Sequence, residues 1–259
     1  MDSCDQHPTQ LRVDARVESH AMPRRLIAVI PARAGSKRVP HKNVRELCGR
    51  PILAYTIEAA IEARVFDRVI VTTDSDEVAK LAEAFGAEVP FYRDPALADD
   101  HTPVSAATLD ALNQVDPNGT MYSCVAQLMV NCPLRTAADI RASLAQFVTT
   151  RAQSQISITS FGWFNPWWAV TQDESRHINP LFPPQTNERS QDLPRLYCPT
   201  GAIWWITAAT LREAGTFHIS NRTGWEIDWH RAVDIDTEDD WCMAELLMRD
   251  RLGQGSTQA

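Results

Sequence analysis

The chain has 259 residues, 44% of them hydrophobic and 22% charged, which is typical of a globular protein with one large domain, with or without an insertion. Its formal net charge of -8 argues against a general binder of nucleic acids or anionic membranes. We expect neither a membrane span nor a signal peptide, because no apolar run has the required length and flanks.

The first 24 residues show no sustained periodicity and are predicted to be a disordered tail. Residues 24–30, RRLIAVI, predict a strand whose continuous apolar part, LIAVI, is typical of a parallel strand buried on both faces. Leu53 and Ile57 then begin an apolar repeat at helical spacing, which predicts an amphipathic helix. Residues 68–74 predict a second buried strand.

Strands and helices continue to alternate up to about residue 150. We predict a helix capped by Asp74 or Ser75 and ended by Gly86, a short strand at 87–93, a helix at 102–115, a strand at 124–130 and a helix at about 136–149. This alternation with short links predicts a doubly wound, mainly parallel α/β sheet with right-handed crossovers.

The pattern changes after about residue 150, where prolines and tryptophans become frequent and helical periodicity is poor. We predict an inserted region at about 155–200, with a subdomain, a lid and a dimerisation arm as alternatives. Its aromatic stretch Trp163–Trp168 favours packing against a partner subunit over stacking on a base or sugar. A strand at 201–206 and a helix at 237–252 follow, so we place the main domain at 25–252.

Six cysteines are scattered along the chain, without a C-x-x-C pair and without metal-ligand spacing to a histidine. This pattern favours reduced thiols in a cytoplasmic protein over a disulfide framework.

A cluster of basic residues follows the first predicted strand, in the segment IPARAGSKRVPHKN at 30–43. In open α/β sheets ligands bind beyond the carboxyl ends of strands, and this segment begins at such an end. Gly35 permits close approach of an anion to backbone N–H groups, and Arg33, Lys37 and Lys42 add positive charge. We predict a phosphate-binding loop, with a solvated basic loop as the alternative. The segment is not a Walker A loop, because G-x-x-x-x-G-K-[ST] is absent.

The segment DID at 234–236 is a candidate metal site. Residues two apart in a strand point to the same side, so Asp234 and Asp236 would present two carboxylates together. Carboxylate oxygens combined with substrate phosphates suit Mg²⁺. The alternative is that Asp236 caps the helix that follows.

These segments belong to a collinear set that resembles the acylneuraminate cytidylyltransferases, or CMP-sialic acid synthetases, and their relatives acting on other nonulosonic acids. The set runs over about residues 25–250 and consists of IPARAGSKRVPHKN, GRPILAYTIEAA, FDRVIVTTDSDEVAKLAEAFGAEVPFYRDPALADD, CPLRTAADI, LPRLYCPTGAI and AVDIDTEDDW.

The resemblance implies a Rossmann-like nucleotidyltransferase that transfers CMP from CTP to the anomeric hydroxyl of an acidic nine-carbon sugar and releases pyrophosphate. It also implies Mg²⁺ at Asp234 and Asp236, and a homodimer in which the inserted region reaches the neighbour's site. The residues implied for the nucleotide are Ala32, Arg33, Ala34, Gly35, Ser36, Lys37, Lys42, Asn43 and Arg93, with Arg33, Lys37 and Lys42 as catalytic residues. Those implied for the sugar are Met129, Asn131, Arg135, Arg189 and Gly201, although Arg135 could instead brace its loop.

Several positions differ from the sialic acid synthetases of this family. Met129 stands where they carry a glutamine, Cys198 where they carry an arginine, and Ser190 at a second arginine position, next to Arg189. These departures favour a 9-deoxy acid of the legionaminic or pseudaminic type over N-acetylneuraminate, since lost donors would leave polar groups of the sugar unpaired. The alternative is that Arg189 and Arg195 replace the lost arginines.

Other functions stay open on sequence grounds. One is a catalytically silent module that binds nucleotide sugars. Within the enzyme class, GTP could replace CTP, or the eight-carbon acid Kdo could be the acceptor. The presence of both the basic loop and the aspartate pair argues against the silent module, since a sensor need not hold a metal for pyrophosphate departure.

Overall fold

The computed structural model describes residues 25–36, 38–99, 102–162 and 164–256. The predicted tail at 1–24 and Lys37 of the basic loop lie outside the described residues. Among the helices that the structure describes, none combines the length and apolar character needed to cross a membrane.

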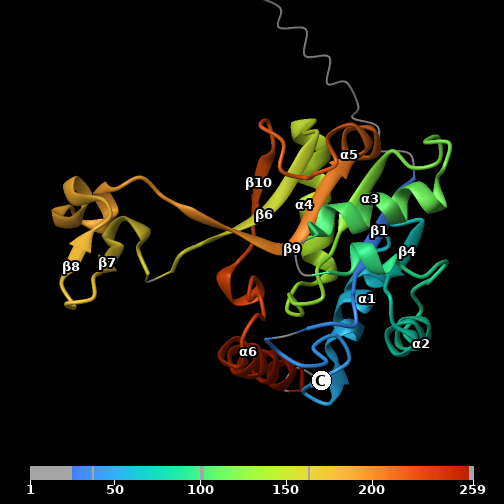
Figure 1. Cartoon of the computed structure of the whole chain (residues 1–259), viewed down its shortest axis with the longest axis horizontal. Helices are drawn as coiled ribbons and strands as arrows, with labels where there is room; N and C mark the ends of the chain where they lie inside the picture. Colours follow the sequence, from blue (N-terminus) through green and yellow to red (C-terminus); the bar gives the residue numbers. More distant parts are fainter. Residues whose placement is uncertain (1–24, 37, 100–101, 163, 257–259) are drawn as a thin grey trace, which may run out of the picture.

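The described residues form a six-stranded central sheet in the order β10-β6-β9-β5-β1-β4 (Figure 1). Its strands are β1 (Leu26–Pro31), β4 (Arg68–Thr72), β5 (Cys124–Gln127), β6 (Ser154–Ser160), β9 (Tyr197–Thr207) and β10 (Thr223–Glu226). β1 pairs in parallel with β4 and β5, and β6 pairs in parallel with β10. β9 is antiparallel to β5 and β6. The predicted α/β fold with a mainly parallel sheet is confirmed, with β9 as an inserted antiparallel strand.

Helices cover both faces of this sheet. They are α1 (Ile52–Ala63), α2 (Asp76–Ala84), α3 (Val104–Val115), α4 (Ala137–Thr150), α5 (Ala208–Ala214) and α6 (Glu238–Ser256). In β1, Leu26, Ala28 and Ile30 pack into the core shared with α1, α2, α4 and α6, whereas Ile27 and Val29 pack into the core shared with α3 and α5. Because side chains alternate along a strand, a continuous apolar run buries both faces of the sheet.

Local capping signals set the starts of two of these helices. Ser75 caps α2, since its side chain accepts a hydrogen bond from the N–H of Val78. Thr136 and Asp139 form a capping box at the start of α4, each side chain accepting from the backbone of the other. The helices predicted at 102–115 and 136–149 are found within two residues of their expected bounds.

Two predicted strands differ from the structure. Residues 87–93, all of them described, form two isolated bridges, at Glu88 and Tyr92, in place of a strand. Pro90 lies between the bridges and has no N–H to donate to a ladder. The strand predicted at 124–130 ends at Gln127, and the residues after it leave the sheet to form one wall of a cleft.

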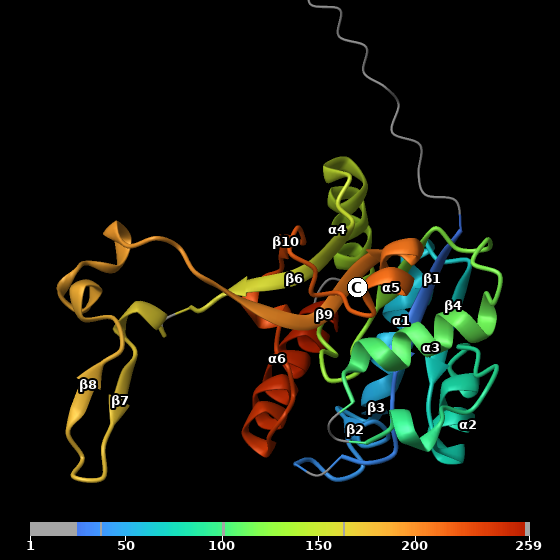
Figure 2. The same ribbon diagram turned by 45° about the horizontal axis from the view of Figure 1, so that its top comes forward.

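The described residues between β6 and β9 project from the body as an arm (Figures 1 and 2). The arm ends in a hairpin of β7 (Val170–Gln172) and β8 (Ile178–Pro180), and its inner part holds the 3₁₀ turns η2 (Pro166–Trp168), η3 (Pro183–Asn187) and η4 (Ser190–Asp192). The insertion predicted at about 155–200 thus has its first and last residues in the central sheet, because β6 and β9 pair there. Two short strands, β2 (Glu46–Leu47) and β3 (Arg50–Pro51), and the turns η1 (Pro95–Leu97) and η5 (Trp229–Arg231) complete the fold.

The arm has a small interior and a large apolar exterior. Trp167 packs edge-on against Phe182, with ring centroids 5.2 Å apart, and its indole N–H donates to the carbonyl of Pro194 at 2.8 Å. Phe164, Ile178 and Leu181 face solvent, and Phe164 is 75% exposed. Exposed apolar side chains gathered on one projecting segment are typical of an interaction surface.

Candidate active site

A cleft of about 480 Å³ opens at the carboxyl ends of β1 and β5. The predicted site residues that line it are Arg33, Gly35, Ser36, Lys42, Asn43, Arg93, Met129, Asn131 and Asp236. This is the end of a parallel sheet where ligands of α/β proteins bind.

The basic loop begins as a continuation of β1. Ala32 is buried and donates its N–H to the last carbonyl of β4 at 3.0 Å. The N–H of Ala34 donates to Oδ1 of Asp74 at 2.8 Å, and Nδ2 of Asn43 donates to the carbonyl of Arg33 at 2.8 Å. The first bond ties the loop to the end of β4 and the second joins its two ends, so the loop is folded back on itself over the cleft.

Two guanidinium groups belong to the wall of this cleft. Nη1 of Arg33 donates to the carbonyl of Ala98 at 3.1 Å, and Nε of the buried Arg93 donates to Oγ1 of Thr72 at 3.2 Å. Burial lowers the pKa of Arg93 to about 10, although the nearby Asp74 opposes this change. A group with that pKa is still protonated at neutral pH, so Arg93 adds a positive charge to the site.

Lys42 joins the basic loop to the aspartate segment, which follows it in the chain by more than 190 residues. Its Nζ donates to the carbonyl of Ile235 at 2.7 Å and lies 3.5 Å from Oδ1 of Asp236. A second tie lies just beyond, where Nη1 of Arg45 pairs with Glu238 at 2.7 Å. The phosphate-binding candidates and Asp236 therefore share one cleft, and Asp234 lies outside its lining.

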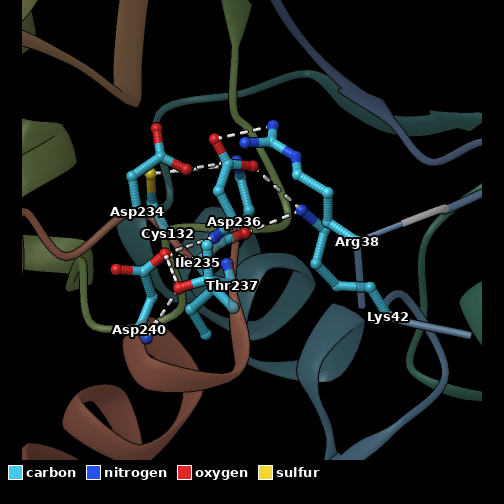
Figure 3. A network of polar contacts seen from close by, with 9 residues as sticks. Arg38, Lys42, Cys132, Asp234, Ile235, Asp236, Thr237 and Asp240 are labelled. Atoms are coloured by element: carbon cyan, nitrogen blue, oxygen red, sulfur yellow. Dashed lines mark hydrogen bonds and ion pairs between the residues drawn. The ribbon is translucent and has the colours of Figure 1, made fainter. Parts of the chain in front are cut away.

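The aspartate segment has a different backbone from the one predicted. Residues 232–236, all of which are described, form no strand, so the alternation expected for a strand does not apply. The carboxylates of Asp234 and Asp236 nevertheless lie near each other above the start of α6 (Figure 3). Thr237 and Asp240 cap α6 reciprocally, at 3.2 Å and 2.8 Å. The alternative that Asp236 caps this helix is wrong, and its carboxylate faces the basic loop.

The surroundings of Asp234 favour a bound cation. Its side chain is exposed to solvent, and Nδ2 of Asn131 donates to its Oδ1. Desolvation, and then the negative charge of Asp236, raise the pKa of Asp234 to about 6, while Lys42 opposes the rise. A divalent cation between the two carboxylates would remove the repulsion that raises this pKa.

The donor set fits Mg²⁺ in particular. In the described part of the chain, no cluster of three or more His, Cys, Asp or Glu side chains is placed to hold a metal. Mg²⁺ does not need one, because it is commonly bound by one or two carboxylates together with substrate phosphates and water. Asp234 and Asp236 supply that number of carboxylates beside a candidate phosphate loop.

The cleft lining also includes residues predicted for the sugar. Met129 and Asn131 line the cleft, and the N–H of Met129 donates to the carbonyl of Gly201 at 3.2 Å. A Cβ on Gly201 would lie 2.9 Å from Cγ of Met129, closer than side chains normally approach. Gly201 therefore lies behind Met129 and allows it to pack against β9.

Arg135 and Arg189 do not line the cleft. Arg135 is 1% exposed, and its Nη2 donates to the carbonyl of Met129 and, at 3.1 Å, to Oγ1 of Thr56. It thus braces the Met129 loop from beneath, the second of the two roles that the sequence left open. Arg189 is on the arm, where its Nε donates to Asp192 at 2.7 Å.

The cleft also contains residues that sequence reasoning did not single out. Arg38 is one of them, and its Nη2 lies 3.0 Å from Oδ2 of Asp236. Its position inside the basic loop was the signal that could have found it. Leu97, Val104 and Ala107 come from η1 and α3, and they were not among the predicted site residues.

The sequence comparisons agree with this geometry. A family model described as "Cytidylyltransferase" matches residues 27–132. CMP-N,N'-diacetyllegionaminic acid synthase of Legionella pneumophila is 32% identical over 232 residues, which cover 86% of this chain and 96% of that protein. The chain belongs to the acylneuraminate cytidylyltransferase family. Another member, pseudaminic acid cytidylyltransferase of Campylobacter jejuni, is 28% identical, with the same shares of both chains covered.

A solved structure agrees on the fold of this cytidylyltransferase. It is the CMP:2-keto-3-deoxy-manno-octonic acid synthetase complexed with CTP, which superposes with a TM-score of 0.67 over 88% of this chain and 99% of that chain. The two are 17% identical in sequence, a level at which the likeness concerns the fold alone.

Proposed function

We propose that the protein transfers CMP from CTP to the anomeric hydroxyl of a nonulosonic acid and releases pyrophosphate. The observation that carries the proposal is the meeting of the basic loop and the aspartate pair, where Nζ of Lys42 lies 2.7 Å from the carbonyl of Ile235 and 3.5 Å from Asp236. Nucleotidyl transfer needs positive charge on the triphosphate and a cation at the reacting phosphorus, and this cleft offers sites for both.

The cationic side chains hold the triphosphate in line for attack. Arg33 and Lys42 approach it from the folded-back loop, Arg93 from the wall, and Lys37 belongs to the same loop. The anomeric oxygen bonds to the α-phosphorus, the bond to the β-phosphate oxygen breaks, pyrophosphate leaves with the electron pair, and the hydroxyl proton passes to solvent. Fixed positive charge lowers the barrier because negative charge accumulates on the phosphate oxygens.

Asp234 and Asp236 would hold a Mg²⁺ ion in this reaction, and Asn131 would keep the carboxylate of Asp234 oriented. When bound, the ion supplies charge stabilisation to the attacking and leaving oxygens.

The sugar is of the pseudaminic or legionaminic type. The wall residue Met129 offers an apolar surface, which suits the terminal methyl group of a 9-deoxy acid better than a hydroxyl group. The two relatives described above are named for acids of this type. Neither Arg189 nor Arg195 lines the cleft of its own chain, which argues against their replacing the lost arginines there.

The arm packs against a second copy of the chain, and the enzyme acts as a homodimer. Its exposed Phe164, Ile178 and Leu181 give such a contact its apolar area. The enzyme is placed in the cytoplasm, because the five cysteines that the structure describes are free thiols.

Pyrophosphate release tests the proposal directly. Purified protein is given each of the four nucleoside triphosphates with Mg²⁺ and, in turn, N-acetylneuraminate, a diacetylated 9-deoxy acid and Kdo. We expect turnover with CTP and the highest kcat/KM for the 9-deoxy acid. Binding without turnover for every pair would mean a silent binding module, and a higher kcat/KM for N-acetylneuraminate would refute the choice of sugar.

A further inference from the structure

Arg38 and Lys42 neutralise the same carboxylate from the basic loop. Nη2 of Arg38 lies 3.0 Å from Oδ2 of Asp236, and Nζ of Lys42 lies 3.5 Å from Oδ1 (Figure 3). Each oxygen of Asp236 therefore has its own cationic partner.

The two cations are held very differently. Lys42 is 16% exposed and has a stronger second bond, to the carbonyl of Ile235 at 2.7 Å. Arg38 is 67% exposed, and within the described residues it makes no other hydrogen bond. An exposed ion pair of this kind is weak, so Arg38 can leave Asp236 at little cost, whereas Lys42 is anchored.

We propose that Arg38 exchanges partners, from Asp236 when the metal is absent to the triphosphate when metal and nucleotide bind. The inference rests on the proposed function, because it assumes that Asp236 binds the metal ion and that the cleft binds CTP. Arg38 blocks one oxygen that the metal needs, and it lines the cleft where the phosphates would lie. A guanidinium group that leaves a carboxylate is well suited to a phosphate, because a carboxylate and a phosphate each offer two oxygens that accept paired N–H bonds.

This exchange predicts opposite effects of one substitution on two ligands. Arg38→Ala removes the competitor for Asp236, so Mn²⁺ should bind about twofold to fivefold more tightly in the absence of nucleotide. The same substitution removes a phosphate donor, so CTP with Mg²⁺ should bind about tenfold more weakly. Both affinities are measured by calorimetry without any sugar, and free Mn²⁺ is also counted by its electron paramagnetic resonance signal.

Arg249→Ala is the matched control. Arg249 is 66% exposed and pairs with Glu245 on α6 at 2.7 Å, so its loss removes the same charge from a similar ion pair away from the cleft lining. We expect wild-type affinities for both ligands. Arg38→Lys, which keeps the charge but not the forked donor, should lie between the wild type and Arg38→Ala for both ligands.

The outcomes separate this inference from the proposed function. If Arg38→Ala leaves either affinity unchanged, or if Arg249→Ala changes both equally, the exchange is refuted while the proposed function stands. If the wild-type protein binds neither Mn²⁺ nor CTP, both are refuted.

Discussion

In the cleft, charged side chains from distant segments pair with one another, whereas on the arm large apolar side chains face solvent. Lys42 bonds to Ile235 and Asp236, while Ile178 and Leu181 are 63% and 56% exposed. The cleft is thus assembled within one chain, and the arm is left with surface that only another molecule could cover. In the proposed homodimer, nucleotide binding would belong to the single chain, and the second copy would complete the sugar site.

The largest effect is expected at the proposed metal ligands. Asp234→Asn keeps the size of the side chain but replaces a carboxylate by an amide, a poor ligand for a hard cation. We expect kcat/KM with Mg²⁺ to fall about a hundredfold or more, which corresponds to roughly 3 kcal/mol. Asp239→Asn, in the exposed first turn of α6, is the control and should keep full activity. An Asp234→Asn enzyme with an unchanged rate and Mg²⁺ dependence would show that Asp234 is structural.

The second largest effect on activity is expected from loss of Lys42, the cation that joins the basic loop to the aspartate segment. Lys42→Ala removes a charge-assisted bond worth about 1.5–3 kcal/mol, so kcat/KM at subsaturating CTP should fall about tenfold to a hundredfold. Circular dichroism should show an intact fold, because Lys42 contributes charge to a loop and no core packing. Lys80→Ala, at an exposed residue of α2, is the matched control. Near-wild-type activity of Lys42→Ala would remove this residue from the phosphate site.

The arm should respond differently from the cleft. In the double variant Ile178→Asp with Leu181→Asp, charge replaces exposed apolar surface, so dimer affinity measured by sedimentation should weaken about tenfold or more. Affinity for CTP should not change, because the cleft residues are untouched, whereas kcat/KM for the sugar should fall with the dimer fraction. Leu246→Asp, at an apolar residue of α6 that is 62% exposed, is the control and should stay dimeric. Parallel losses of CTP and sugar binding would contradict the division between the two regions.

Substitution of a carboxylate outside both regions should lower stability and leave catalysis unchanged. Asp116 accepts from the N–H groups of Thr120, Met121 and Tyr122, and Arg212 lies 3.1 Å away. Burial opposes ionisation, but these hydrogen bonds outweigh it and lower the pKa of Asp116.

Because its folded-state pKa is lowered, Asp116 stabilises the protein above the unfolded-state pKa of about 4, and this contribution is lost as pH falls through the folded-state value. Asp116→Asn should cost about 1–3 kcal/mol at pH 7, and the difference from wild type should shrink below about pH 4. Urea denaturation at several pH values measures this. An equal deficit at pH 7 and pH 3 would contradict it. Asp110→Asn is the control, because this half-buried carboxylate accepts from a neutral side chain, Gln114, and should show a smaller deficit.

Much of the framework of this protein is encoded locally. The apolar runs that became β1 and β4, the repeat that became α1 and the basic loop after β1 could each be read from neighbouring residues, because strand and helix periods and capping residues act over a few positions. The basic loop could also be placed at a ligand-binding end of the sheet, since it directly follows a buried parallel strand.

Other features depend on where distant segments meet in space. Local periodicity does not reveal that β9 runs antiparallel, because strand direction depends on the path of the arm that precedes it. The two aspartates were expected from a strand, but the described structure brings them together through a non-strand segment that Lys42 and the cap at Thr237 hold in place. Arg135, although charged, is buried and bonds to Thr56, and Arg38 pairs with Asp236. Both partners lie more than 70 residues away in the chain, so neighbouring residues do not reveal these contacts.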